Sequence, residues 1–197
     1  MNKKVVIYLP EGFADWEGAY FMAEMSSANK PYTIVTEEGR PVHSIGRLNV
    51  TPDMALKDLS SEEIETLVLI GSDEWADAEK NKPVLALAER LLSRGQRVAG
   101  ICGATMALGR MGLLDQRRHT SNDLGVLKKM VPTYKGENLY VNQLAVTDGA
   151  LITASGIGPI EFTYELLKAL KVYDTQKLDH WYAMFKRGEL PPMEYWS

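Results

Sequence analysis

Residues 97–104, RVAGICGA, decide the fold, because a short apolar run ends directly at a cysteine that opens a helical pattern. Small residues stand two positions before and two positions after Cys102, in a G-x-C-x-A arrangement. This is a cysteine version of the G-x-S-x-G nucleophile elbow, in which a strained residue is held between a strand and a helix. The stretch therefore predicts a parallel α/β sheet with a nucleophile at the end of one strand.

Short apolar runs alternate with helical patterns along the rest of the chain, as is typical of βαβ units whose strands are buried on both faces. The predicted strands are residues 5–9, 32–35, 67–70 and 97–101. A β-hairpin is predicted over residues 41–50, and a second has the arms 144–147 and 150–154 on either side of the two-residue turn Asp148-Gly149. The predicted helices are residues 16–29, 83–94, 103–110, 123–130, 156–170 and 175–187. Asp15 is the expected N-cap of the first helix, and Asn122 or Asp123 that of the fourth. We therefore predict an α/β fold with a mostly parallel central sheet.

The length and composition are those of one globular domain, here residues 1–197. Hydrophobic residues make up 45% of the chain and charged residues 24%, which is ordinary for a protein with a buried core. A net charge of −4 disfavours nucleic acid and anionic membranes as partners, since phosphate binding needs a basic surface. The apolar run at residues 5–9 is too short for a signal peptide or a membrane span. A single cysteine forms no internal disulfide, so we expect a cytoplasmic protein.

Cys102 is the predicted chemical centre because of its place between strand and helix. The helix dipole and the free N–H groups at a helix N-terminus favour a thiolate, so we expect its pKa to fall below the reference value of about 8.5. The alternative is that Cys102 is a buried small hydrophobic residue, the common state of a free cysteine.

Loops that follow several predicted strands are expected at the carboxyl edge of the sheet, where open α/β sheets bind ligands. Glu17, in the first turn of the first helix, is a candidate partner for the thiol; alternatively it compensates the helix dipole at the surface. Backbone N–H groups near Gly71 and Gly103 are candidates for an oxyanion hole, and an ordinary loop is the alternative for residues 71–73. The other candidate pocket residues are Ser72, Asp73, Asn122, Ser155 and Gly156.

None of the three histidines has metal-ligand spacing with another histidine or with the cysteine, so we predict no metal site. His119 is the best candidate for the second member of a Cys–His dyad, which requires proximity in space. The glycines at residues 156–159 do not complete a dinucleotide-binding motif, and the chain carries no phosphate-binding loop motif. We therefore expect no cofactor.

Three stretches together resemble the PfpI-type superfamily, which is related to class I glutamine amidotransferases. They are residues 12–17 (GFADWE), residues 99–105 (AGICGAT) and residues 153–159 (TASGIGP), the last followed by Glu161 and Phe162. The superfamily includes intracellular proteases, the Parkinson-associated deglycase and chaperone, isonitrile hydratases and stress proteins. The similarity extends over about residues 4–170.

This resemblance implies a flavodoxin-like three-layer sandwich that is usually dimeric. The family's reactive cysteine matches Cys102, and its acidic partner, which holds the thiol through a protonated carboxyl, matches Glu17. The protease branch carries a histidine directly after the cysteine, where this chain has Gly103. The deglycase branch carries one in the loop before the next helix, where this chain has Asn122, and a glycine pair common after the third core strand is replaced here by residues 72–73.

We therefore expect a cysteine-dependent hydrolase, amidase or hydratase that acts on a small molecule or a modified amine through an activated Cys102 thiolate, as a homodimer. A protease with a full Cys–His–acid triad is not expected, because both family histidine positions are changed. The first alternative is a redox-sensing stress protein in which Cys102 oxidises to sulfinic acid. The second is a binding module that has kept the fold without the chemistry.

Overall fold

The computed structural model describes residues 3–195, and a seven-stranded sheet forms its centre. Six of the strands are parallel, and β8 pairs antiparallel with β9 at one edge. The strand order is β5 (Met54–Ala55), β2 (Tyr32–Thr36), β1 (Lys4–Tyr8), β6 (Ile64–Leu69), β7 (Arg97–Ile101), β9 (Leu151–Ala154) and β8 (Ala145–Asp148). The predicted α/β class with a mostly parallel sheet is confirmed.

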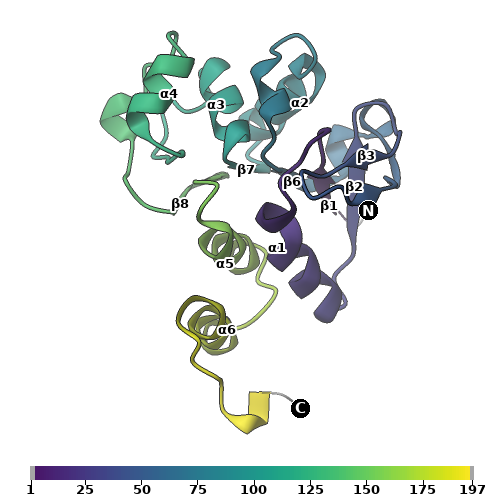
Figure 1. Ribbon diagram of the computed structural model, residues 1–197, viewed down its shortest axis with the longest axis vertical. Helices are drawn as coiled ribbons and strands as arrows, with labels where there is room; N and C mark the ends of the chain where they lie inside the picture. Colours follow the sequence, from purple (N-terminus) through teal and green to yellow (C-terminus); the bar gives the residue numbers. More distant parts are fainter. Residues whose placement is uncertain (1–2, 196–197) are drawn as a thin grey trace.

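Helices cover both faces of the sheet and make a three-layer sandwich of the flavodoxin-like kind (Figure 1). One face carries α1 (Asp15–Ser27), α5 (Pro159–Ala169) and α6 (Thr175–Arg187). The other carries α2 (Lys82–Ser93), α3 (Gly103–Arg110) and α4 (Leu124–Met130). A separate hairpin joins β3 (Val42–His43) to β4 (Asn49–Val50). Short 3-10 turns lie at Leu56–Asp58, Ser61–Glu63, Asp73–Ala76, Glu137–Leu139 and Met193–Tyr195.

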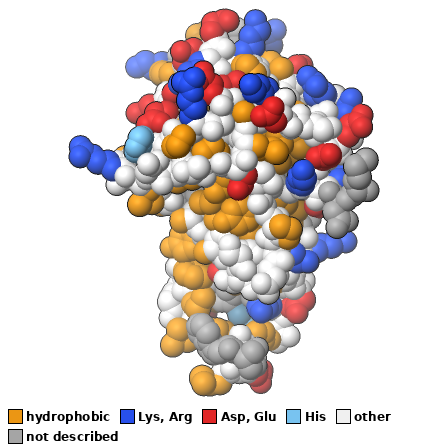
Figure 2. All heavy atoms as spheres, turned by 90° about the vertical axis from the view of Figure 1, so that its right-hand side faces the viewer, with side chains coloured by type: hydrophobic (Ala, Val, Ile, Leu, Met, Phe, Trp, Pro, Cys, Tyr) orange, Lys and Arg blue, Asp and Glu red, His pale blue; other side chains and the backbone are white. Residues whose placement is uncertain are grey.

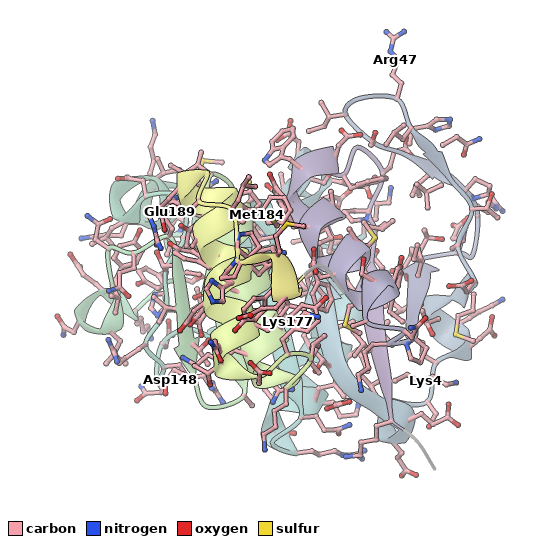
Figure 3. All side chains as sticks on the ribbon, turned by 90° about the horizontal axis from the view of Figure 1, so that it is seen from below. Lys4, Arg47, Asp148, Lys177, Met184 and Glu189 are labelled. Atoms are coloured by element: carbon pink, nitrogen blue, oxygen red, sulfur yellow. The ribbon has the colours of Figure 1, made fainter. Side chains whose placement is uncertain are left out.

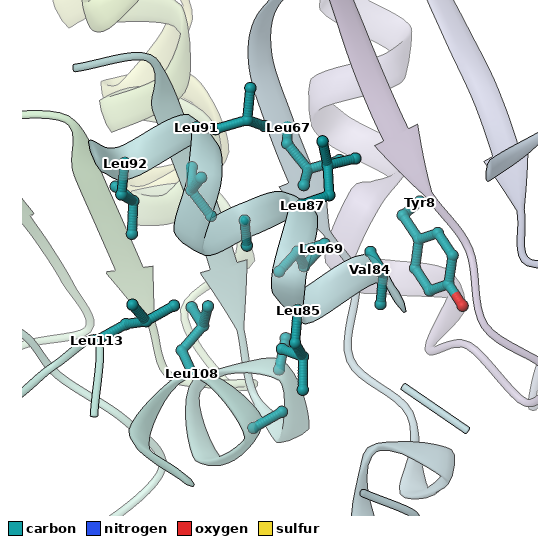
Figure 4. Close-up of a cluster of buried hydrophobic side chains, with 14 of the residues drawn as sticks. Tyr8, Leu67, Leu69, Val84, Leu85, Leu87, Leu91, Leu92, Leu108 and Leu113 are labelled. Atoms are coloured by element: carbon teal, nitrogen blue, oxygen red, sulfur yellow. The ribbon is translucent and has the colours of Figure 1, made fainter. Parts of the chain in front are cut away.

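The core lies on both faces of the sheet, because side chains alternate along each strand. In β1, Val6 and Tyr8 join the cluster beneath α2 and α3, whereas Val5 and Ile7 join the cluster beneath α1 and α5. Figure 4 shows the first cluster, where leucines of α2 and α3 gather over Leu67 and the neighbouring strands. Burial on both faces explains why the strands read as continuous apolar runs.

The predicted bounds of β7, α3 and α6 agree with the structure, and Asp123 caps α4 by accepting a hydrogen bond from the Val126 N–H at 2.8 Å. The prediction that Asp15 caps the first helix is wrong. The residue before α1 is Ala14, which makes no side-chain cap. The Asp15 carboxylate instead accepts hydrogen bonds from the Ser44 hydroxyl and, at 2.8 Å, from the Gly46 N–H. It therefore ties the β3–β4 hairpin to the start of α1.

Parallel strands β1, β6, β7 and β9 all end at the same edge of the sheet. Their carboxyl ends lead into the loops that carry the predicted site residues. Within residues 3–195, no helix has both the length and the apolar character that a membrane span requires. Figure 2 shows acidic and basic side chains interspersed on one face of the molecule, with hydrophobic atoms exposed between them.

Candidate active site

Cys102 sits on the turn between β7 and α3 in a strained backbone conformation, with φ 58° and ψ −122°. Non-glycine residues rarely adopt a positive φ, and such strain typically costs about 1–3 kcal/mol. The turn is fixed by the Cys102 N–H, which donates to the Ala154 carbonyl at 3.0 Å, and by the Thr105 hydroxyl, which donates to the Cys102 carbonyl at 2.6 Å. The elbow geometry predicted from the G-x-C-x-A pattern is therefore present.

Glu17 reaches the same place from the first turn of α1, and only 1% of its surface is exposed. Its Oε2 accepts a hydrogen bond from the Gly71 N–H at 2.7 Å. Its Oε1 is buried and accepts no regular hydrogen bond from the described residues. Burial raises the pKa of the Glu17 carboxyl to about 7, against smaller lowering effects from Gly71 and from the Cys102 thiol. Glu17 is therefore poised to exchange a proton near neutral pH.

Asn122 approaches the sulfur from the loop before α4, and its Nδ2 donates to the Cys102 Sγ at 3.3 Å. Its Oδ1 accepts hydrogen bonds from the Gly156 N–H at 2.8 Å and from the Ser155 hydroxyl at 3.5 Å. Because the Gly156 N–H can only donate, it fixes which end of the amide faces the sulfur. Asn122 thus presents a donor to the thiol and no base.

Gly156 brings the two reactive side chains together by leaving space between them. A Cβ atom at this position would lie 2.9 Å from the Cys102 Sγ and 3.0 Å from Glu17 Oε1. Both distances are shorter than ordinary carbon contacts, so a side chain here would push one of the groups aside. The glycine also shows that the sulfur and Oε1 border the same small volume.

Gly103 explains why the position after the cysteine carries no histidine. A Cβ atom there would lie 2.5 Å from the Ser72 carbonyl oxygen and 3.2 Å from Trp75 Cδ1. The first contact is with backbone, which cannot rotate away as a long side chain can. A larger residue at this position would therefore require the loop after β6 to move.

The pKa of the Cys102 thiol is raised, and the prediction that it is lowered is wrong. Burial has the largest effect, followed by the nearby charge of Glu17, because both disfavour a thiolate. Hydrogen bonds from Asn122 and from the Gly103 N–H act in the opposite direction. Since Cys102 and Glu17 interact, they titrate as a pair in which the loss of one proton hinders the loss of the next.

The pocket above the sulfur has a volume of about 510 Å³ and is largely apolar. Trp16 and Ile157 form its rim with 49% and 81% of their surfaces exposed, and Pro159 continues it. The Trp16 Nε1 donates to the Gly156 carbonyl at 3.0 Å, which holds the rim in place. Trp16 and Ile157 were not predicted as pocket residues. The available signal was that each directly adjoins a predicted site residue in the sequence, Glu17 or Gly156.

Comparison with known proteins agrees with this arrangement, since residues 3–169 match the DJ-1/PfpI family. The chain belongs to the DJ-1/PfpI family. It is 35% identical over 193 residues to the "Uncharacterized protease YoaZ" of Bacillus subtilis, covering 94% of this chain and 91% of that protein.

Solved structures of DJ-1/PfpI proteins have the same fold. A thiJ/pfpI family protein from Bacillus anthracis superposes with a TM-score of 0.90 at 36% identity, covering 100% of this chain and 94% of that one. The DJ-1 superfamily protein Atu0886 from Agrobacterium tumefaciens gives a TM-score of 0.83 at 36% identity, covering 94% of this chain and 100% of that one. The resemblance inferred from three short motifs is therefore confirmed over nearly the whole chain.

The structure does not bring all of the expected residues of this DJ-1/PfpI site to the sulfur. The Ser72 hydroxyl donates to the Glu11 carbonyl at 2.6 Å and accepts from the Glu74 N–H at 3.0 Å, so it shapes its own loop. Asp73 is exposed, and neither residue lines the pocket. The Gly71 N–H already donates to Glu17, which removes it from the expected oxyanion hole.

His119 is not a partner of the thiol, although it was the best candidate among the three histidines for a Cys–His dyad. It is completely buried, and its ring nitrogens contact the Arg117 carbonyl at 2.7 Å and the Tyr134 hydroxyl at 2.6 Å. Burial lowers its pKa, so the ring stays neutral. Within residues 3–195, no group of three or more side chains of metal-ligating type is gathered in one place.

Proposed function

We propose that this DJ-1/PfpI protein is a cysteine-dependent hydrolase, amidase or hydratase that acts on a small molecule. The observation that carries the proposal is the Cys102 thiol on a strained elbow beside one buried carboxyl whose pKa is about 7. A general base works best when its pKa lies near the working pH. Glu17 meets this condition, whereas His119 has both ring nitrogens engaged elsewhere.

The proposed first step is attack of the Cys102 sulfur on an electrophilic carbon of an amide, a nitrile-type group or a modified amine. As the S–C bond forms, the thiol proton passes to the Glu17 carboxylate, and an electron pair moves onto the substrate heteroatom. For an amide-type substrate, including a modified amine, the electron pair returns from the oxygen, the C–N bond breaks, and Glu17 gives the proton to the departing amine; for a nitrile-type group, which loses no leaving group, Glu17 gives the proton to the nitrogen. Water then attacks the carbon of the resulting thioester or thioimidate and passes a proton to Glu17, the S–C bond breaks, and the departing sulfur takes that proton back to restore the thiol. Proton transfer to Glu17, and not a low thiol pKa, activates the nucleophile.

The size and character of the pocket support a small substrate with an apolar part. A volume of about 510 Å³ accommodates a molecule of metabolite size. Trp16 and Ile157 offer apolar contacts, and Asn122 offers an amide donor beside the sulfur. Glu17 is the buried acidic group, so a neutral electrophile fits better than an anion, which its carboxylate form would repel.

The experiment is a survey of small amides, nitriles and amine–aldehyde adducts with the wild type, Cys102→Ser and Glu17→Gln. Products are followed by liquid chromatography and covalent adducts by intact-protein mass. We expect turnover and an adduct at Cys102 in the wild type, slower turnover in Glu17→Gln, and neither in Cys102→Ser. Turnover that persists in Cys102→Ser would contradict the proposal. Equal inertness of all three proteins would favour a binding module.

A second candidate function is redox sensing, which the buried Glu17 carboxyl beside the sulfur supports. One hydrogen peroxide converts the thiol to sulfenic acid and water, and a second gives the sulfinic acid and water. A sulfinate oxygen at Sγ would accept a hydrogen bond from a protonated Glu17. Mild peroxide followed by intact mass tests this: addition of two oxygen atoms in the wild type and fewer in Glu17→Gln is expected. A sulfur that stays unoxidised would contradict it.

We further propose that the protein works in the cytoplasm as a homodimer. The lone cysteine suits a reducing compartment. Exposed apolar side chains near the pocket and the hairpin, namely Ile45, Leu48 and Ile157, support association with a second copy. Light scattering coupled to gel filtration is expected to give twice the chain mass, and a monomer would contradict the dimer.

A further inference from the structure

A second pocket lies at the opposite edge of the sheet from Cys102. It borders Arg97, the first residue of β7, whereas Cys102 follows the last residue of that strand. Its volume is about 550 Å³, and its walls come from β8, from α5 and from the segment before His119. Asp148, labelled in Figure 3, marks the β8–β9 turn that this pocket adjoins. The pocket is therefore distinct from the candidate active site.

Positive side chains dominate this second pocket. Arg97, Arg118 and Lys168 line it, and none of them forms an ion pair with any residue in the described range 3–195. Lys168 lies 5.8 Å from the centre of the Tyr164 ring, a weak contact that leaves its charge uncompensated. The pocket contains one carboxylate, Glu165, which accepts a hydrogen bond from the Thr147 hydroxyl at 2.6 Å. A second carboxylate, Asp148, lies beside the pocket, where its Oδ2 accepts a hydrogen bond from the Arg118 N–H at 2.7 Å. Three cations against two carboxylates still give a local excess of positive charge in a chain whose net charge is −4.

The Arg97 guanidinium carries a donor that lacks a partner. Its Nη1 donates to the Thr66 hydroxyl at 3.1 Å, but its Nε is buried and unpaired among the described residues. A buried donor without an acceptor is unfavourable, and native proteins leave few of them. An anion bound between Arg97, Arg118 and Lys168 would offset the repulsion among these three cations.

The positive surface continues beyond this pocket. A neighbouring pocket shares Arg97 and Gly149 with it and adds Lys3 and Arg94, together with one carboxylate, Glu65. The guanidinium of Arg97 thus lies between two cavities that are both rich in cations. A ligand with more than one negative charge fits this arrangement better than a single halide ion.

We propose that Arg97, Arg118 and Lys168 form a binding site for a small phosphorylated molecule. Arginine forks match the oxygens of a phosphate group, and lysine adds a point charge. The exposed Arg118 and Lys168 are free to close on the ligand, while the half-buried Arg97 is held in place by its hydrogen bond to Thr66. This site is separate from the Cys102 chemistry and does not depend on the proposed function.

The test uses isothermal titration of the full chain with inorganic pyrophosphate, with sodium chloride at matched ionic strength as the control titration. We expect saturable binding, weakened about tenfold by Arg118→Ala and by Lys168→Ala, since hydrogen bonds to charged groups contribute energies of this order. Lys129→Ala removes an exposed cation from α4, far from the pocket lining, and is the matched control. It should leave the affinity unchanged.

Two more variants separate the built site from general charge. Arg97→Lys keeps the positive charge but removes the planar guanidinium fork, and we expect it to weaken binding. Glu165→Gln removes the carboxylate that lines the pocket and should strengthen binding. Thermal unfolding identifies any variant that fails to fold. If a variant expected to bind more weakly fails to fold, the affinity of Glu165→Gln, which is expected to rise, tests the proposal instead. Absence of saturable binding, or equal losses in Arg118→Ala and Lys129→Ala, would overturn the proposal. Citrate at equal charge shows whether phosphate chemistry or charge alone is recognised, and equal affinity for both would contradict a phosphate site.

Discussion

The Cys102 site and the His119 cluster both bury a titratable side chain in the same half of the molecule, yet they are built in opposite ways. His119 is flanked by Tyr134 and Tyr140 in edge-to-face contacts, and both of its ring nitrogens have partners. Cys102 is held at a positive φ, and its neighbour Glu17 retains a buried oxygen without a regular hydrogen bond. The histidine cluster is fully satisfied, whereas the cysteine site stores strain and unmet hydrogen-bonding capacity.

The two regions therefore respond to pH in opposite directions. The pKa of Glu17 is raised in the folded protein, so its contribution to stability is present at low pH and is lost as the pH rises to about 7. The pKa of His119 is lowered, so its contribution is present at neutral pH and is lost as the pH falls below about 6.5, its ordinary value. The pH dependence of stability therefore distinguishes the His119 cluster from the Cys102 site without a substrate.

The largest expected effect is on the pH dependence of stability in Glu17→Gln. Between about pH 4.5 and pH 7 the wild type should lose on the order of 3 kcal/mol relative to the variant, because its buried carboxyl must ionise and the amide does not. Urea unfolding of both proteins across this range measures the difference. A constant difference between the two proteins would show that Glu17 does not carry a raised pKa.

The second largest effect is expected on the stability of the variant His119→Phe, which keeps an aromatic ring but removes both ring nitrogens. The Tyr134 hydroxyl and the Arg117 carbonyl lose their partner, and we expect a loss of about 2 kcal/mol in the free energy of unfolding near neutral pH. Iodoacetamide labelling of Cys102 should keep its wild-type rate. A large loss of labelling in a folded variant would contradict the purely structural role of His119.

The smallest effect is expected on the alkylation rate of Cys102 in the variant Asn122→Ala, which tests the role of Asn122 beside the sulfur. The hydrogen bond from Asn122 lowers the pKa of the thiol, so its removal should raise that pKa and slow alkylation at neutral pH by about fivefold. Ser155→Ala is the matched control, because Ser155 reaches only the far oxygen of the same amide. Equal alkylation rates in Asn122→Ala and the wild type would show that Asn122 does not affect the reactivity of the thiol.

Much of the fold was predictable because local signals and tertiary structure agree. The apolar run before Cys102 and the Asp148-Gly149 turn gave the bounds of β7 and the pairing of β8 with β9 correctly. The strand β5 was missed, since its two residues carry no periodicity. Asp15 was misassigned because Ser44, distant in sequence, competes for its carboxylate. Such long-range partners leave no local pattern.

The site was predictable to a lesser degree. Cys102, Glu17 and Asn122 follow from the rule that parallel strands place their loops at one edge, combined with the family resemblance. The direction of the thiol pKa shift was not predictable, because it depends on burial, and the helix N-terminus alone suggests the opposite sign. The exposed Trp16 and Ile157 carry no chemical motif, so only the structure identifies them as the pocket rim.

The most direct test is the rate of Cys102 alkylation by iodoacetamide as a function of pH in the wild type and in Glu17→Gln. If the two residues titrate as one pair, the wild-type profile has a step near pH 7 from Glu17 and a later step from the thiol. Glu17→Gln should lose the first step and show a lower thiol pKa, because the carboxylate charge that raises it is gone. Superimposable profiles would contradict the account.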